Sequence, residues 1–376
     1  APTSFGGAPT EHEILASGVS IGDLPLFVQE RGEQISLGAE YRGATVGRKR
    51  AAEVLDAFGR ALTACCRRPH HRVDELRPSG AELDLVGPPL DEAPSVLERI
   101  VGHARATPGA IAVRAVEGDV RYGELVARAS AIAAGIRSTA PGAARGGVAV
   151  HRTAELLPSI VGVWMAGAAY VPLDPTVPSA RRERIVGAAA LDLVVADHDV
   201  SSWCPVPRLA TAEAGVADLE ELPQIALEDP AYVVFTSGST GVPAGVVVTH
   251  ANLAASTAAR PQVYGREPPA RFLLTSSIGF DSSMVGLYWP LATGGSILLA
   301  GDDDVHDIDR LAAFVDSGAA THLLMVPTLY RALLERHAGR LDSLRVAIVA
   351  GESCPAALVD DHHRLLPDVA LYNEYG

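Results

Sequence analysis

Short apolar runs alternate with longer amphipathic segments over most of the chain. Runs of this length, rich in Val, Ile, Leu and aromatic residues, are typical of buried strands. They lie at residues 111–116, 147–150, 170–173, 193–196, 231–236, 271–275, 296–300, 321–326, 346–349 and 369–372. Apolar residues recur at helical spacing in residues 122–137, 153–166, 179–189, 307–317 and 329–338. This alternation predicts an α/β fold of helices and largely parallel sheets in layers.

The first part of the chain has a different pattern. Two strand-like runs within residues 24–41 precede a predicted helix at residues 48–66. The helix places its apolar residues on one face: Val54, Leu55, Phe58, Leu62 and Cys65. Residues 79–97 are rich in Pro, Gly and acidic residues, which is typical of a linker. We therefore predict three parts, at residues 1–78, 79–97 and 98–376.

Charge and composition narrow the classes of partner. The net charge of −14 argues against nucleic acid or an anionic membrane as a partner. The most apolar stretch, residues 159–173, is about 15 residues long, short of the ~20 that span a bilayer, and is predicted as a core helix running into a core strand. The N-terminus has no signal-peptide pattern, and the four cysteines have neither metal-ligand spacing nor disulfide density. We expect free thiols and a cytoplasmic protein.

A loop rich in glycine and hydroxyl residues follows the strand predicted at residues 231–236. Its sequence, TSGSTGVPAG at residues 236–245, suits the binding of anionic oxygens through backbone N–H groups and hydroxyls. Composition alone fits an ordinary hairpin turn equally well. A P-loop would need a lysine after its last glycine and a helix behind it. Neither Gly238 nor Gly241 is followed by lysine, and residues 246–249 form a strand pattern, so a P-loop NTPase is rejected.

Five motifs in order resemble those of the adenylate-forming (ANL-like) enzymes, specifically the adenylation domains of nonribosomal peptide synthetases. Besides the loop, these are VRYGEL at 120–125, MAGAAYVPLDP at 165–175, FDSS at 280–283 and NEYG at 373–376. The resemblance implies that residues 98–376 form the large N-terminal subdomain of such a domain, incomplete at its C-terminus. It also implies ATP and Mg²⁺ as cofactors, and a reaction in which an amino acid and ATP give aminoacyl-AMP and pyrophosphate.

The resemblance also implies site residues. The loop would hold the ATP phosphates through Thr236, Ser237, Gly238, Ser239, Thr240 and Gly241, and adenine would contact Asn373 and Tyr375. The family usually has lysine where this chain has Ala244. The family's Mg²⁺ glutamate and catalytic lysine follow the NEYG motif, so we expect no catalytic residue and no metal ligand within residues 1–376. The fragment alone is expected to be inactive.

Asp281 is the most informative residue outside the loop, because a carboxylate in an apolar stretch is costly to bury without a cation. In the family, the aspartate of this motif binds the substrate's α-ammonium group; the simpler alternative is a helix N-cap. Phe280 resembles the aromatic residue that flanks ATP. The residues resembling the selectivity pocket are Asp281, Ser282, Val285, Leu324, Ile348, Ala350 and Glu374. They favour a hydrophobic or aromatic amino acid, with Glu374 able to accept a phenol hydroxyl.

Residues 1–78 are similar to the tail of a condensation domain, a short α+β remnant, so the fragment would be truncated at both ends. The implied partners are an upstream condensation domain, a carrier domain whose phosphopantetheine thiol receives the amino acid, and a small activator protein. The pair His70-His71 lacks the spacing of condensation catalysis. The pair His362-His363 is predicted on a solvated helix face.

Two alternatives stay open. An acyl- or aryl-CoA ligase of the same superfamily would not need Asp281. A catalytically silent adenylation-like module is kept open by Ala244, because the expected cation beside the phosphates is missing.

Overall fold

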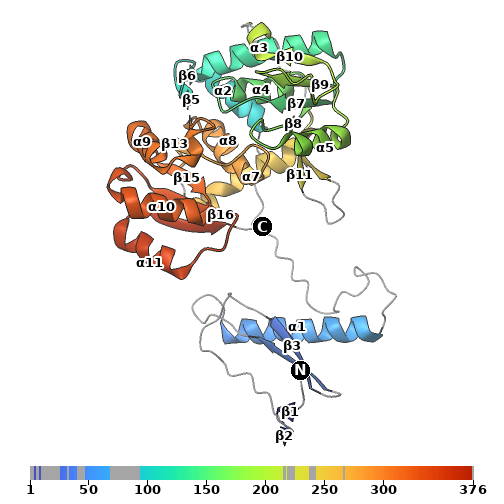
Figure 1. The fold of residues 1–376 in the computed structure, drawn as a ribbon, viewed down its shortest axis with the longest axis vertical. Helices are drawn as coiled ribbons and strands as arrows, with labels where there is room; N and C mark the ends of the chain where they lie inside the picture. The colour runs from blue at the N-terminus through green and yellow to red at the C-terminus, as the bar shows by residue number, and fades with distance from the viewer. Residues whose placement is uncertain are drawn as a thin grey trace. The chain divides into compact units, whose positions relative to one another are not determined.

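The computed structural model describes residues 4–5, 8–9, 26–31, 34–39, 47–67, 94–214, 217, 225–236, 243–265 and 267–374. The chain divides into two compact units, Ala1–Pro88 and Pro89–Gly376 (Figure 1). In the first unit, β3 (Leu26–Arg31) pairs antiparallel with β4 (Gln34–Ala39) ahead of α1 (Arg48–Arg67). A short pair, β1 (Ser4–Phe5) and β2 (Ala8–Pro9), precedes them. The two predicted strands and the helix are confirmed.

The second unit contains a six-stranded sheet in the order β10-β9-β7-β8-β11-β12. Its strands are β7 (Arg145–Ala149), β8 (Ala169–Pro172), β9 (Leu193–Ala196), β10 (Arg208–Ala210), β11 (Pro230–Thr236) and β12 (Ala244–Thr249). Neighbouring strands are parallel except for the antiparallel pair β11 and β12. The carboxyl ends of the five parallel strands therefore share one edge of the sheet.

A second sheet has seven strands in the order β17-β16-β15-β13-β14-β5-β6. Its strands are β5 (Ile111–Ala115), β6 (Gly118–Arg121), β13 (Arg271–Leu274), β14 (Ser296–Leu299), β15 (His322–Met325), β16 (Val346–Ala350) and β17 (Ala370–Glu374). Only the hairpin of β5 and β6 is antiparallel among these described strands. The largely parallel character predicted from the sequence is confirmed.

Helices cover both sheets in layers (Figure 1). They are α2 (Val96–Ala106), α3 (Tyr122–Thr139), α4 (Leu156–Met165), α5 (Ser179–Ala189), α6 (Thr211–Ala214), α7 (His250–Tyr264), α8 (Ser283–Ala292), α9 (Ile308–Gly318), α10 (Pro327–His337) and α11 (Ala356–Leu365), with 3₁₀ turns at Asp304–His306 and Ala338–Arg340. The largest core cluster joins α2, α3, α4 and α8 to residues of both sheets. Helix α5 packs on the other face of the six-stranded sheet, and α9, α10 and α11 pack on the other face of the seven-stranded sheet.

Strand alternation explains this layering. In β9, Val195 belongs to the core between the sheets, whereas Val194 faces the cluster under α5. Because successive side chains of a strand point to opposite faces, a strand covered on both sides needs apolar residues at every position. This is why the strands appear in the sequence as continuous apolar runs.

The sequence pattern missed several helices, of which α8 is the clearest case. All ten of its residues are buried, so no polar face marks it as amphipathic. Helix α2 has a better local signal, because Ser95 and Glu98 form a reciprocal capping box at its first turn. Helix α2 begins at Val96, so the last two residues of the predicted linker at residues 79–97 lie in its first turn. Residues 79–93 of that segment and His70-His71 lie outside the described residues.

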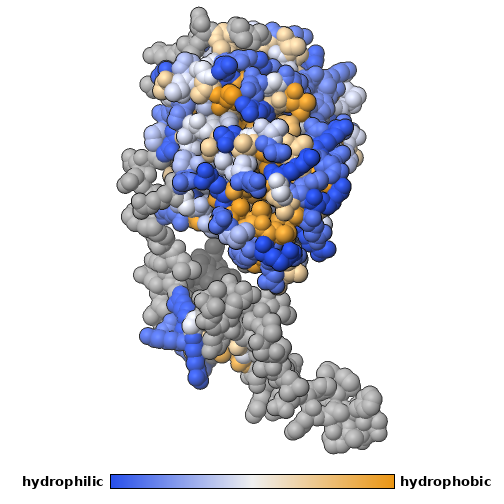
Figure 2. All heavy atoms as spheres, turned by 90° about the vertical axis from the view of Figure 1, so that its left-hand side faces the viewer, coloured by the Kyte–Doolittle hydropathy of each residue, from blue (hydrophilic) through white to orange (hydrophobic). Residues whose placement is uncertain are grey.

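The surface of the second unit is largely hydrophilic. Hydrophilic residues predominate on the face drawn in Figure 2, with smaller apolar patches between them. Among the described helices, none combines the length and apolarity needed to cross a bilayer. The apolar stretch noted in the sequence forms α4 and β8, which are buried in the core as predicted.

The expectation that His362 and His363 share a solvated helix face is wrong for His362. Its side chain is fully buried beneath α11, while His363 is exposed. One ring nitrogen, Nδ1, lies 2.7 Å from the Tyr330 hydroxyl, and Nε2 lies 2.8 Å from the Val369 carbonyl oxygen. The imidazole therefore joins α11 to α10 and to the chain leading into β17. Burial lowers the pKa of His362, which favours the neutral ring.

We expect His362→Ala to lower the free energy of unfolding by about 2–4 kcal/mol, because it leaves a cavity and two buried polar groups without partners. The matched control, His363→Ala, should change it by less than about 0.5 kcal/mol. Urea unfolding of both variants measures the difference. Equal effects would contradict the structural role given to His362.

A second buried histidine, His322 in β15, predicts a pH dependence. Burial, with a smaller contribution from Arg345, lowers the pKa of His322 to about 4. The unfolded chain binds this proton below about pH 6.5 and the folded chain does not, so this group makes stability fall as pH falls. Between pH 7 and pH 5 we expect it to contribute about 1–2 kcal/mol of that fall. Urea unfolding against pH should show a shallower slope for His322→Gln, and an unchanged slope would count against this assignment.

Candidate functional site

The hydroxyl-rich loop joins two antiparallel strands. β11 ends at Thr236 and β12 begins at Ala244, and these two residues are paired across the ladder. The exposed Thr236 hydroxyl donates to the Ala244 carbonyl oxygen at 3.4 Å. The predicted strand–loop–strand arrangement is confirmed, and the following strand excludes the helix that a P-loop requires. The loop residues Ser237, Gly238, Ser239, Thr240 and Gly241 lie outside the described residues.

A concave surface lies beside the end of β11. Its lining residues include Asp174, Arg181, Arg182, Phe235, Ser277 and Phe280. The Ser277 hydroxyl donates to the Asp174 carboxylate, which joins the loop after β13 to the loop after β8. Phe280 is 52% exposed, and the Arg181 guanidinium lies 5.9 Å from its ring centroid. Loops from the carboxyl edges of both sheets therefore meet at this surface.

The structure brings four of the predicted pocket residues into one apolar cluster. Val285, Leu324, Ile348 and Ala350 are buried together with Tyr264, Phe272, Trp289 and Val346. Strand register accounts for the grouping: Leu324 pairs with Ile348, and Ala350 pairs with Glu374. Paired residues on neighbouring strands lie on the same face of the sheet, and so do residues two positions apart on one strand. Leu324, which had no sequence anchor nearby, thus lies among the other predicted residues.

Glu374 forms an ion pair with Arg260 that was not predicted from the sequence. Its Oε1 lies 3.8 Å from Nη1 of Arg260, whose side chain is 12% exposed. Burial lowers the pKa of Arg260, and the Glu374 charge opposes that shift. Burial, followed by the Glu374 charge, raises the pKa of Tyr264. Arg260 and Tyr264 both belong to α7, which the apolar pattern did not predict, so the pair could not be found from the sequence.

The environment of Asp281 differs from the expectation. Its side chain is exposed at the start of α8 rather than buried among apolar residues, and its Oδ1 accepts a hydrogen bond from the Ser282 backbone N–H at 2.7 Å. The N-cap of α8 is Ser282, so the alternative of an Asp281 N-cap is also wrong. Burial raises the pKa of Tyr232 in β11 to about 12, and the negative charge of Asp281 adds to this shift. Asp281 therefore lies close enough to β11 to interact with it.

Three buried polar atoms beside the apolar cluster have no hydrogen-bond partner within the described residues: Arg260 Nε, Trp289 Nε1 and His322 Nε2. The Trp289 and His322 rings lie 5.3 Å apart, edge to face. Such atoms usually find a protein or water partner when buried. The end of the cluster is therefore more polar than the predicted pocket residues suggested, and neither ring was identified from the sequence.

Of the two predicted adenine contacts, Asn373 lies near the end of β17. Asn373 is exposed and pairs with Val349 of β16, so it stands one residue before Glu374 at the carboxyl edge of the seven-stranded sheet. Tyr375 lies outside the described residues. Thr236 ends β11, Phe280 and Asp281 lie between β13 and α8, and Asn373 lies near the end of β17. All four are close to the carboxyl edges of the sheets, where loops supply binding groups.

Comparisons with known proteins agree with this architecture. The solved structure of the nonribosomal peptide synthetase FmoA3 with AMPPNP bound has a TM-score of 0.71 at 24% identity, covering 94% of this chain and 40% of that chain. The N-terminal subdomain of Klebsiella oxytoca NpsA in complex with 3-hydroxybenzoyl-AMSN has a TM-score of 0.68 at 21% identity, covering 75% of this chain and 72% of that one. At these identities the likeness shows the fold.

Sequence relatives show the family. Bacitracin synthase 3 of Bacillus licheniformis is 31% identical over 73% of this chain, and phenyloxazoline synthase MbtB of Mycolicibacterium paratuberculosis is 36% identical over 70% of it. The chain spans 4% and 23% of their respective lengths. A family profile described as AMP-binding enzyme matches residues 101–376. The chain therefore belongs to the AMP-binding enzyme family.

Proposed function

We propose that this chain belongs to a nonribosomal peptide synthetase module and activates an amino acid with ATP, giving aminoacyl-AMP and pyrophosphate. The observation that supports this most directly is the convergence of Val285, Leu324, Ile348 and Ala350 in one cluster. These residues were predicted as a pocket from their position-by-position resemblance to the family's selectivity pocket, although they are far apart in the sequence. An unrelated fold would not be expected to bring them together.

In the proposed reaction the substrate carboxylate attacks the α-phosphorus of ATP in line, and no protein nucleophile takes part. Backbone N–H groups and hydroxyls of residues 236–241 would stabilise charge on the leaving pyrophosphate. Mg²⁺ would neutralise part of the phosphate charge. Asn373 and Tyr375 would hold the adenine, with Phe280 beside the nucleotide. The exposure of Phe280 and Asn373 leaves both side chains accessible to a ligand.

The substrate's α-ammonium group would bind Asp281. Because that carboxylate is exposed, a cation can reach it from solvent. Ser282 would lie beside it, at the start of α8. The side chain of the amino acid would enter the apolar cluster, which fits a hydrophobic or aromatic group. Glu374, already neutralised by Arg260, could still accept a hydrogen bond from a phenol hydroxyl without requiring a cationic substrate.

The aminoacyl group would then pass to the phosphopantetheine thiol of a carrier domain. We propose residues 1–78 as the tail of a condensation domain, residues 79–97 as a linker and residues 98–376 as the core of the adenylation domain. The condensation domain, the carrier domain and a small activator protein are the proposed partners. The proposed substrate class is a hydrophobic or aromatic amino acid.

The first test is amino-acid-dependent ATP–pyrophosphate exchange by the full-length module, with all twenty amino acids. We expect Asp281→Asn to lower kcat/KM for the amino acid at least about 100-fold, because it removes a charge-assisted contact worth about 3 kcal/mol. The matched control, Asp303→Asn, removes an exposed carboxylate elsewhere and should leave exchange unchanged.

Other outcomes identify the alternatives. Exchange supported only by carboxylic acids without an amino group, and unaffected by Asp281→Asn, would indicate a CoA ligase. Silence with every amino acid would indicate an adenylation-like binding module.

The second test concerns Ala244, which begins β12 across from Thr236 at the base of the loop. We expect Ala244→Lys in the full-length module to lower KM for ATP about three- to tenfold, because it adds a cation near the phosphates. Val247→Lys adds the same charge on the same strand at a residue that is 50% exposed. If both variants change KM for ATP equally, the effect is one of net charge and the assignment of position 244 is wrong.

A further inference from the structure

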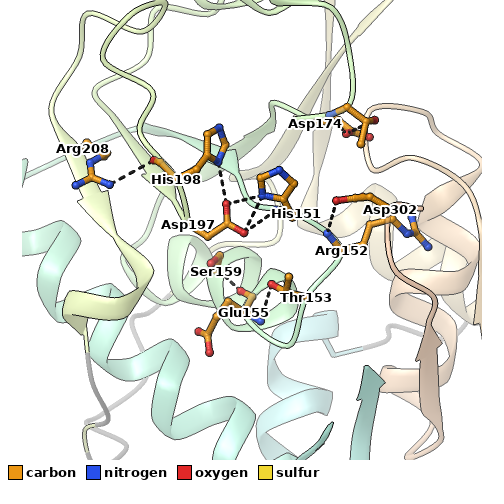
Figure 3. A network of polar contacts seen from close by, with 11 residues as sticks. His151, Arg152, Thr153, Glu155, Ser159, Asp174, Asp197, His198, Arg208 and Asp302 are labelled. Atoms are coloured by element: carbon orange, nitrogen blue, oxygen red, sulfur yellow. Dashed lines mark hydrogen bonds and ion pairs between the residues drawn. The ribbon is translucent and has the colours of Figure 1, made fainter. Parts of the chain in front are cut away.

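Two histidines and an aspartate gather at the carboxyl edge of the six-stranded sheet, outside the site described above (Figure 3). β7 and β9 are parallel neighbours whose last residues, Ala149 and Ala196, are paired. The segments that follow therefore leave the sheet side by side. His151 lies two residues beyond β7, and Asp197 and His198 directly follow β9.

The three side chains point toward one another (Figure 3). Nδ1 of His151 lies 3.0 Å and 3.1 Å from the two carboxylate oxygens of Asp197, and Nδ1 of His198 lies 2.9 Å from Oδ1. The three ligand atoms all lie within 4.8 Å of one another. The rings approach edge to face, with centroids 4.9 Å apart.

We propose that His151, Asp197 and His198 are the three protein ligands of a divalent transition-metal ion, with Zn²⁺ preferred. Zn²⁺ binds histidine nitrogen and carboxylate oxygen at about 2.0–2.2 Å, which places neighbouring ligand atoms about 3.3 Å apart in a tetrahedral site. The observed nitrogen–oxygen distances need to lengthen by only a few tenths of an ångström. Two imidazoles and one carboxylate are a ligand set that suits Zn²⁺ better than Mg²⁺ or Ca²⁺.

Partial exposure leaves room for a fourth ligand from solvent. The side chains of His151, His198 and Asp197 are 40%, 26% and 16% exposed. A water molecule can therefore complete a tetrahedral site, as in zinc sites that keep one position open. Binding through Nδ1 places the remaining proton of each neutral imidazole on Nε2.

The surroundings hold the ligands in place. The His151 backbone N–H donates to Asp197 Oδ2 at 3.0 Å, and Arg208 donates to the His198 carbonyl oxygen at 3.3 Å. Asp302 lies close enough to His151 for their charges to interact, and within the described residues its buried Oδ1 has no hydrogen-bond partner. A carboxylate beside a ligating histidine is a frequent outer partner in metal sites.

The same contacts also describe a simpler arrangement, an aspartate that accepts hydrogen bonds from two histidines. Burial alone would raise the pKa of Asp197. Hydrogen bonds from His198 and from the backbone and ring of His151 outweigh this effect, so the pKa of Asp197 is lowered. Metal binding itself distinguishes the two arrangements.

The experiment is a titration of the chelator-treated 376-residue chain with Co²⁺, followed by visible absorption, and then competition with Zn²⁺. We expect one Co²⁺ per chain, displaced by Zn²⁺, and an unfolding midpoint that rises by a few degrees with Zn²⁺. His198→Gln and Asp197→Asn should each weaken binding at least about 100-fold. His363→Gln, at an exposed position on α11, should not change it.

Binding that is absent, or equal in the wild type and the two ligand variants, would overturn the proposal and leave the hydrogen-bonded arrangement. Unfolding in the presence of chelator shows whether the variants fold; a folded variant without the metal-dependent rise in midpoint supports the assignment. Neither readout depends on amino-acid activation, so failure here and failure of the proposed activity can be told apart.

Discussion

The arrangement of the second unit depends on one buried cation, Arg152. Arg152 lies in the loop after β7 of the six-stranded sheet. Its guanidinium donates hydrogen bonds to the carbonyl oxygens of Ala300 at 2.8 Å, of Ser276 at 2.9 Å and of Leu274. These carbonyls end or follow β14 and β13 of the other sheet. Burial lowers the pKa of Arg152 to about 10, opposed by the charges of Asp302 and Asp174, so the group stays charged at neutral pH.

Because Arg152 joins the two carboxyl edges, the loops that leave those edges are held in a fixed relation. The concave surface lined by Phe235 and Phe280 and the contact between Ser277 and Asp174 lie at the same seam. Tyr122 and Trp164 add ties inside the layer between the sheets: the Tyr122 hydroxyl donates to the Leu291 carbonyl at 3.1 Å, and the Trp164 indole donates to the Ala231 carbonyl at 2.7 Å.

Much of the fold could be predicted from the sequence because the inner strands of both sheets are covered on two faces, which turns these strands into continuous apolar runs. The grouping of Val285, Leu324, Ile348 and Ala350 was also expected, from their resemblance to the family's selectivity pocket. The exposure of Asp281 and the burial of His362 did not, because they depend on where helices end in three dimensions. The pairing of Glu374 with Arg260 joins residues more than a hundred positions apart, and no local pattern marks it.

If the apolar cluster receives the amino-acid side chain as proposed, helix α8 has a consequence for how its selectivity can change during evolution. Val285 and Trp289 face the apolar cluster, whereas Met284, Leu287 and Tyr288 of the same helix belong to the core between the sheets. A Cβ added at Gly286 would come within 2.9 Å of Leu274 and Phe272 side-chain atoms, so the helix has little freedom to shift. A new substrate preference is therefore easier to acquire by substitutions at the ends of β15, β16 and β17 than by substitutions in α8. A change of side-chain volume in α8 would also disturb the core between the sheets.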